Sequence, residues 1–255
     1  MPIIQQLLIA CPLVFLAGFI DSVAGGGGLI SLPAYYMAGL PPHFALGTNK
    51  MSSSIGTVFS TATYIRGGFV YKRIIPVSVA GALLGSWIGA HCALLLDEQV
   101  LRWLMVALIP VLAVFTVLKK DLFAPKEQNM PLIKEQVITA VIALAIGWYD
   151  GFFGPGTGMF LILAFVSILR LNPVTASGNA KVINLCSNIA AVVTFAIGGK
   201  VLYILALPCA AFSITGNLLG ARLTIKNGAK IIKPVMLVVV LLLLITIIKD
   251  LVLNF

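Results

Sequence analysis

The sequence predicts an all-α membrane protein built from two inverted repeats, each a broken, re-entrant helical segment followed by three transmembrane helices. Hydrophobic residues make up 60% of its 255 residues and charged residues only 10%, and its two halves share a pattern of Gly, Asp and Lys. A mean hydropathy of +1.08 leaves too few polar side chains to cover a water-soluble globule of this size. Lipid is therefore the expected solvent for most of the chain.

The internal repeat is visible in residues that recur at a constant spacing. Asp21 corresponds to Asp150 at a spacing of 129 positions, and after a two-residue insertion the spacing becomes 131, which pairs Lys50 with Lys181. The spacing of 131 also relates further prolines and glycines: Pro42 and Pro173, Gly47 and Gly178, Gly67 and Gly198, Gly68 and Gly199, Gly85 and Gly216, Gly89 and Gly220. The predicted organisation is a first repeat over 1–118, a cytoplasmic linker over 119–135 that carries much of the clustered charge, and a second repeat over 136–255.

Apolar stretches long enough to cross a bilayer core, which takes about 20 helical residues, define the elements of each repeat. Glycines interrupt the first such stretch of each half, over 3–40 and 136–170. The uninterrupted spans are predicted over 44–64, 74–95, 99–118, 174–196, 201–221 and 233–249.

The distribution of Lys and Arg between the loops favours an arrangement in which each interrupted segment enters and leaves on the same side, because these residues collect on the cytoplasmic side of a membrane. If each segment crossed once, the loop charges would divide nine against six. If each folds back as a hairpin, they divide twelve against three: Arg66, Lys72, Arg73, Lys119, Lys120, Lys126, Lys134, Arg170, Arg222, Lys226, Lys230 and Lys233 against Arg102, Lys200 and Lys249. Three crossings per half then invert the second repeat and place both termini on the outer, periplasmic side. A Gly-rich span that crosses with a kink is the alternative.

The glycine breaks are the first candidate binding elements. They contain Gly25, Gly26, Gly27 and Gly28 in the first half and Gly154, Gly156, Thr157 and Gly158 in the second. Glycine allows a ligand to approach the backbone, and the helix that restarts after each break points its N–H groups and its positive dipole end into the gap. Two such ends would form an anion-binding cradle, whereas tight packing of small residues between helices is the alternative explanation.

Lys50 and Lys181 are the strongest single candidates, because a lysine inside a membrane costs about 2.5–3.5 kcal/mol on insertion scales. Asn49 precedes the first lysine, while Asn184 and Asn188 lie three and seven residues after the second. On a helix, Lys181 and these two amides would share one face. Snorkelling of the lysines toward a span end is the competing interpretation.

Asp21 and Asp150 precede the two breaks at matched positions. Proton transfer during transport and pairing with the lysines are equally favoured roles for these carboxylates. The sequence predicts no metal site and no cofactor, since His43 and His91 have no second ligand at metal spacing and the four cysteines lie apart in apolar stretches.

The glycine breaks and the lysine motifs also carry a resemblance to a known family. The residues concerned are Gly18-Phe-Ile-Asp-Ser-Val-Ala-Gly-Gly-Gly-Gly28 with Pro33, Thr48-Asn-Lys50, Tyr149-Asp-Gly-Phe-Phe-Gly-Pro-Gly-Thr-Gly158, Ala180-Lys181 and Ser187-Asn188. Together they resemble the sulfite exporter TauE/SafE family, also called the toluene-sulfonate uptake permeases, and specifically its YfcA-like branch. Alanine is also compatible with the family motif at Thr157 and Gly158, so these two side chains select no substrate.

The resemblance implies a multi-pass transporter of the bacterial inner membrane that carries sulfite, sulfonates or other small organic anions, often outward. The expected function is thus secondary transport, as an exporter, of a small anion, with protons as a candidate coupling ion. An anion channel is the first alternative. A membrane-embedded enzyme is the second, although the sequence contains no HExxH or GxSxG motif. Nucleic acid is not an expected partner, because the basic residues are scattered between apolar stretches.

Overall fold

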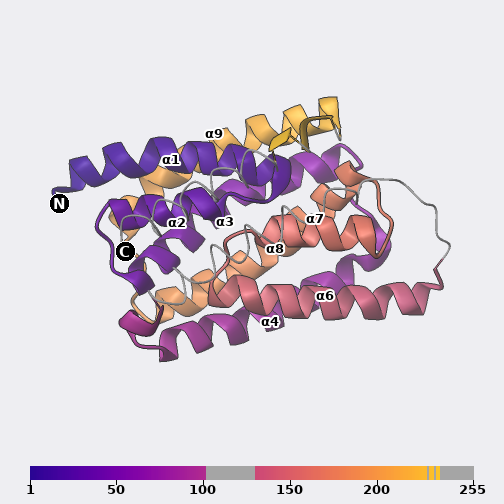
Figure 1. Cartoon of the computed structure of the whole chain (residues 1–255), viewed down its shortest axis with the longest axis horizontal. Helices are drawn as coiled ribbons and strands as arrows, with labels where there is room; N and C mark the ends of the chain where they lie inside the picture. Colours follow the sequence, from indigo (N-terminus) through magenta and orange to yellow (C-terminus); the bar gives the residue numbers. More distant parts are fainter. Residues whose placement is uncertain (102–129, 229, 233, 236–255) are drawn as a thin grey trace, which may run out of the picture.

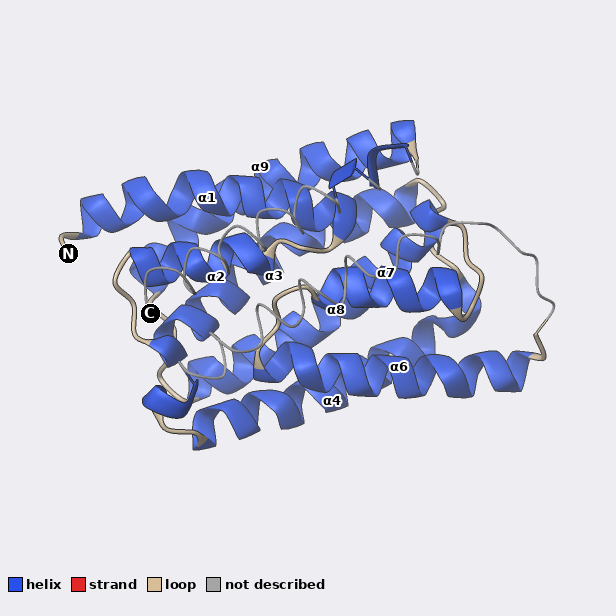
Figure 2. Ribbon diagram, in the orientation of Figure 1, coloured by secondary structure: helices blue, strands red, loops and turns tan. Residues whose placement is uncertain are grey.

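The computed structural model describes residues 1–101, 130–228, 230–232 and 234–235, and every regular element in these ranges is a helix (Figures 1 and 2). In chain order the helices are α1 (Ile3–Ala24), α2 (Gly28–Met37), α3 (Pro42–Arg66), the 3₁₀ turn η1 (Lys72–Ile74), α4 (Ile75–Leu95), α6 (Leu132–Phe152), α7 (Thr157–Ser167), α8 (Pro173–Ile197) and α9 (Tyr203–Asn227). The all-α class is therefore confirmed for this part of the chain.

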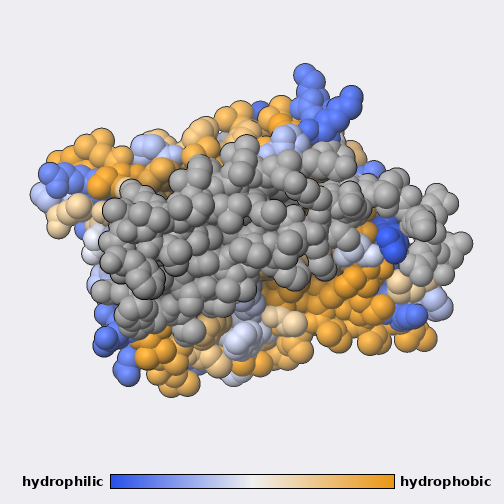
Figure 3. All heavy atoms as spheres, in the orientation of Figure 1, coloured by the Kyte–Doolittle hydropathy of each residue, from blue (hydrophilic) through white to orange (hydrophobic). Residues whose placement is uncertain are grey.

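Five of the described helical stretches are long and apolar enough to cross a membrane: α1, η1 with α4, α6, α8 and α9. Helix α3 has 25 residues but falls outside this set, because Thr48, Asn49 and Lys50 begin a run of polar side chains along it. Most residues of α3 are buried among its neighbours, so it does not need an apolar surface. On the face seen in Figure 3, hydrophobic residues cover most of the described surface along the helices, and the hydrophilic residues gather toward the two ends.

The repeated residues occupy matching helix boundaries. Helices α3 and α8 both have 25 residues and both begin with a proline, Pro42 and Pro173, at a position where the missing N–H costs no hydrogen bond. Both end before a glycine pair whose second member has positive φ, 77° at Gly68 and 66° at Gly199. Residues with a side chain rarely adopt positive φ, so each glycine pair ends its helix, and it does so at matching positions of the two repeats.

Helices of each half pack mainly against helices of the other half. Helix α1 lies against α9, α6 lies against α4, and α3 and α8 pack together between them. Glycines allow the close approach: a Cβ added at Gly85 or Gly89 would overlap the carbonyl oxygens of α6, and one at Gly216 or Gly220 would overlap those of α1. The matched glycines of the two halves thus serve matched helix contacts.

Each interrupted segment folds back on itself. Helices α1 and α2 contact each other across the turn at 25–27, and α6 and α7 do so across 153–156. Figure 1 shows α1 entering the bundle from the end marked N and α2 returning toward that end, while α6 and α7 enter and return at the opposite end. The first arm of each hairpin is about twice as long as the second, since α1 has 22 residues and α2 has 10.

Basic side chains gather at one end of the bundle. Contacts between Tyr71 and Glu135 and between Gln136 and Arg73 bring the start of α4 to the start of α6 at this basic end. The charged loops and helix termini there, including the end of α3 and the end of α9, contribute Arg66, Lys72, Arg73, Lys134, Arg170, Arg222, Lys226 and Lys230. The opposite end carries Lys200, Asp97 and Glu98 in its described part, together with the N-terminus.

Helix α6 begins at Leu132, four residues before the predicted start of the second repeat at 136. Glu135 is buried there and accepts a hydrogen bond from Tyr71, 3.1 Å away, which explains why a charged residue lies within the first turn. Residues 119–129 of the predicted linker and most of the predicted spans 99–118 and 233–249 lie outside the described residues.

We expect Gly89→Leu to destabilise the protein by about 1–3 kcal/mol, because the new side chain would force α4 away from the Trp148 carbonyl on α6. Thermal unfolding in detergent measures the effect. Ile88→Leu is the matched control, since Ile88 is 40% exposed on the outer surface of the same helix. Equal melting temperatures for the two variants would show that α4 and α6 are not in close contact.

Candidate functional site

The two glycine breaks meet in the middle of the bundle. The N–H of Met159 donates to the carbonyl oxygen of Gly25 over 3.2 Å, and a Cβ added at Gly25 or at Gly158 would overlap the other glycine's backbone. Gly25 ends α1 with φ 76°, while Gly154 and Gly156 have φ 96° and 80°. The breaks therefore need glycine both for their backbone conformation and for their mutual contact.

Two helix N-termini lie beside this contact. Helix α2 starts at Gly28 and α7 at Thr157, and both of these residues line a single cavity. Within the described residues, the N–H groups of Gly26, Gly27 and Gly28 donate to no backbone carbonyl. Free N–H groups and the positive ends of two helices thus converge where the sequence predicts an anion cradle.

The cavity lies between α1, α2, α3, α6, α7, α8 and α9. Its lining is mostly small or polar: Val14, Ala17, Gly18, Asp21, Gly25, Gly27, Gly28, Ser31, Asn49, Lys50, Ser53, Asp150, Gly154, Thr157, Gly158, Asn184, Asn188, Ser213 and Asn217. It contains no aromatic side chain among the described residues, and it offers hydroxyl and amide groups from five helices.

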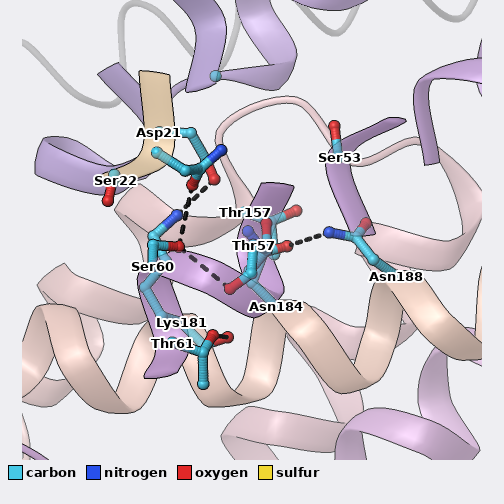
Figure 4. A network of polar contacts seen from close by, with 12 residues as sticks. Asp21, Ser22, Ser53, Thr57, Ser60, Thr61, Thr157, Lys181, Asn184 and Asn188 are labelled. Atoms are coloured by element: carbon cyan, nitrogen blue, oxygen red, sulfur yellow. Dashed lines mark hydrogen bonds and ion pairs between the residues drawn. The ribbon is translucent and has the colours of Figure 1, made fainter. Parts of the chain in front are cut away.

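Two ion pairs join the halves reciprocally. The Lys50 ammonium on α3 lies 2.8 Å from Oδ2 of Asp150 on α6. The Lys181 ammonium on α8 is paired with Asp21 on α1 (Figure 4). Each lysine is thus neutralised by the aspartate of the other half, which confirms pairing, one of the two roles considered for the carboxylates, and leaves proton transfer untested. The lysines do not snorkel, since their side chains are only 3% and 1% exposed.

Amides and hydroxyls surround the Lys50–Asp150 pair. Nζ of Lys50 also donates to Oδ1 of Asn188 over 3.0 Å, and the Ser187 hydroxyl donates to Oδ2 of Asp150 over 2.6 Å. Asn188 in turn donates to Oδ1 of Asn184 over 3.1 Å, a bond drawn in Figure 4. Nζ of Lys50 and Oδ2 of Asp150 therefore each have two polar partners, which offsets the cost of burying them in a medium of low polarity.

Most predicted site residues lie at the cavity: Asp21, Gly25, Gly27, Gly28, Asn49, Lys50, Asp150, Gly154, Thr157, Gly158, Asn184 and Asn188 all line it. Gly26, Gly156 and Lys181 are not among the lining residues. Lys181 was expected to present its ammonium together with Asn184 and Asn188, but it points to Asp21 instead, and Asn188 serves Lys50. Lys181, Asn184 and Asn188 do lie on one helix, as predicted, but the carboxylate that pairs with Lys181 comes from the other half of the chain.

Sequence reasoning missed the contribution of α9. Ser213 and Asn217 line the cavity, and Asn217 accepts a hydrogen bond from Ser60 of α3 over 3.0 Å. A Cβ added at Gly18 would contact Asn217, so Gly18 makes room for this amide. A serine and an asparagine four residues apart in an apolar span were the available signal, because polar residues inside a membrane are costly and usually functional.

Comparison with known proteins places the chain among membrane transporters. The sequence model of the sulfite exporter TauE/SafE family matches residues 10–247. A "probable membrane transporter protein ORF9" of Sinorhizobium sp is 36% identical over 237 residues, covering 92% of this chain and 90% of the relative. A "probable membrane transporter protein" of Haemophilus influenzae is 35% identical, covering 88% and 87%. The "probable membrane transporter protein YfcA" of Escherichia coli is 34% identical, covering 88% and 82%. No solved structure matches the chain significantly.

The buried pairs predict a non-additive double-mutant cycle. Asp21→Asn leaves the buried Lys181 ammonium without a counter-charge, and we expect it to destabilise the protein by about 3–5 kcal/mol. Adding Lys181→Met should recover much of this loss, because neither charge then remains. Unfolding of the four proteins in detergent measures the coupling, with the exposed Lys134→Met as control. Additive losses would show that the two side chains are not paired.

Proposed function

Because the chain belongs to the sulfite exporter TauE/SafE family, we propose that it carries a small anion through the cavity at its centre. The observation that carries this proposal is the convergence of two helix N-termini and the Lys50 ammonium on one polar cavity. Helix N-termini and ammonium groups both favour negative charge, and they do so most strongly where water is scarce. Transport of an anion requires such a site inside the membrane.

The lining of the cavity indicates the class of substrate. Four asparagines and three serines offer hydrogen bonds, and Val14 and Ala17 provide the small apolar part. A compact oxyanion, such as sulfite, a small sulfonate or a short carboxylate, would use these groups fully. An aromatic sulfonate would bury a ring among amides and hydroxyls that it leaves unpaired.

Lys50 is the residue proposed to contact the substrate directly, since it is the lysine that lines the cavity. Lys181 has a supporting part, as the counter-charge that keeps Asp21 from repelling an anion. The glycine breaks contribute their N–H groups, and Asn49, Asn184 and Asn188 contribute amides.

The proposed mechanism is alternating access by two inverted repeats. In support, the α1–α2 and α6–α7 hairpins enter from opposite ends of the bundle, and matched helices make matched contacts. Backbone contact between Gly25 and Gly158 crosses the centre, which favours a carrier with an occluded site over an open anion channel. Export is the direction that the family's name suggests.

The distribution of charge supports an orientation in the bacterial inner membrane. The basic end would face the cytoplasm, because Lys and Arg are retained there, and the N-terminus would be periplasmic. The C-terminus, expected on the same side, lies outside the described residues.

Binding of sulfite, thiosulfate, sulfoacetate, taurine or small carboxylates to the purified protein tests the proposed function. A ligand that binds only the folded state adds about 2.7 kcal/mol of stability at one hundred times its Kd. We expect at least one of these anions to raise the melting temperature. Lys50→Gln should abolish the shift, because it removes the charge at the cavity, whereas the exposed Lys134→Gln should leave it unchanged.

An unchanged shift in Lys50→Gln would place the binding site elsewhere. Saturable flux in proteoliposomes would agree with a carrier, while single-channel conductance in planar bilayers would favour the channel.

Labelling of introduced cysteines tests the orientation. In a variant without the four native cysteines, Lys200→Cys should react with a membrane-impermeant maleimide on intact spheroplasts. Lys134→Cys at the opposite end should react only after permeabilisation. The reverse pattern would invert the proposed topology.

A further inference from the structure

The two ion pairs occupy matched positions, but their surroundings do not match. Asp150 accepts hydrogen bonds from the Lys50 ammonium and from the Ser187 hydroxyl. The residue that corresponds to Ser187 in the first half is Gly56, which has no side chain to offer Asp21. Among the described residues, the Asp21 carboxylate has Lys181 as its one hydrogen-bonding partner.

The lysines differ in the same way. Nζ of Lys50 has a second partner, Oδ1 of Asn188, and the residue that corresponds to Asn188 is Thr57. The Thr57 hydroxyl is buried and has no hydrogen-bond partner in the described part of the chain. Lys50 lines the cavity, whereas Lys181 is 1% exposed and does not. Both aspartates thus line the cavity, but Lys50 is the lysine that reaches it, and only its pair has further polar partners among the described residues.

On the basis of the function proposed above, we propose that only the Lys50–Asp150 pair opens during transport: the substrate anion takes the place of Asp150 beside Lys50 while Asp150 binds a proton. The Lys181–Asp21 pair stays closed and serves as a fixed, neutral support. The two repeats would then share a fold but differ in function, since Asp150 alone would couple the binding of a proton to the binding of the anion.

The charge balance explains why a proton must enter with the anion. At rest Lys50, Lys181, Asp21 and Asp150 carry no net charge together. A monovalent anion alone would make the site negative in a medium where an unbalanced charge is expensive. If a proton from water on the open side of the cavity binds to Oδ2 of Asp150, the neutral acid leaves one positive charge for the anion. The loaded site is again neutral.

The surroundings of Asp150 suit both of its protonation states. A hydroxyl donates to a carboxylate and can turn to accept from a carboxylic acid, so Ser187 can stay bonded after the proton arrives. Lys50 can keep its hydrogen bond to Asn188 when the ion pair between Lys50 and Asp150 opens. The other charged groups that act on this pair are Asp21 on α1 and Lys181 on α8, which neutralise each other.

Proton movement in proteoliposomes tests this division of labour. Vesicles that contain the protein and a trapped pH dye receive methanesulfonate or isethionate, both monovalent anions, from outside. These anions stay ionised, so they cannot carry protons through the lipid as neutral acids. In the wild-type protein we expect the interior to acidify as radiolabelled anion enters.

The variants separate the two pairs. Asp150→Asn imitates the protonated acid, so it should still exchange labelled anion across the membrane but lose the acidification entirely. The double variant Asp21→Asn/Lys181→Met removes the other pair without leaving a lone charge. Whatever its rate, it should keep the wild-type ratio of protons to anions.

Acidification that persists in Asp150→Asn, or that is lost in the double variant, would overturn the inference and leave the carrier function intact. Anion entry into wild-type vesicles without acidification would do the same. If neither anion enters wild-type vesicles, the proposed transport of sulfur anions fails, and this inference fails with it.

Infrared difference spectra of the wild-type protein provide a second measurement that does not depend on the variants folding. Addition of isethionate should produce the C=O stretch of a protonated carboxylic acid. If isethionate perturbs the amide bands, which demonstrates binding, but no such carboxylic acid band forms, Asp150 does not take up a proton.

Discussion

A charged side chain inside a bilayer needs an opposite charge beside it, and the arrangement of this bundle follows from how two lysines meet that need. Lys50 and Lys181 each lie deep in the protein, and each is balanced by an aspartate from the other half of the chain. To bring those partners together, α3 and α8 must sit against each other at the centre, and α1 and α6 must reach them from opposite ends. The helix breaks that follow the two aspartates then meet in the same place, so the charges and the free backbone N–H groups share one cavity.

Close helix packing is the second requirement, because lipid gives apolar helices no reason to associate through their side chains alone. The contacts of α4 with α6 and of α1 with α9 rely on glycines and small residues that bring one backbone against another. These contacts hold the outer helices together, and at the two breaks Gly25 and Gly158 bring the hairpins into backbone contact in the same way. The polar interior of α3 and α8 is tolerable for the same reason: other helices, and not lipid, surround it.

Much of this architecture was accessible from sequence. Hydropathy and the matched residues predicted the helices, their repeat and the position of both breaks, and matched Asp and Lys residues pointed to the centre of the site. Helix α3, predicted as the span 44–64, is too polar to rank with the five apolar helices, since a helix enclosed by other helices is free to be polar. The cross-pairing of Lys181 with Asp21 was not predictable from helical spacing, because it depends on how the halves cross. Asn217 was overlooked within an apolar span, and its contacts with Gly18 and Ser60 show its place at the site.

The exchange of counter-charges between halves has a consequence for how the protein is made. When the first half has left the ribosome, Lys50 and Asp21 are already in or near the membrane, but their partners have not yet been synthesised. The first half must therefore wait in an incomplete state, held near water or in the insertion machinery, until the second arrives. The two ion pairs thus form only after both halves of the chain have been synthesised. A chain truncated between the halves would lack the two residues with which Asp21 and Lys50 are paired in the complete protein.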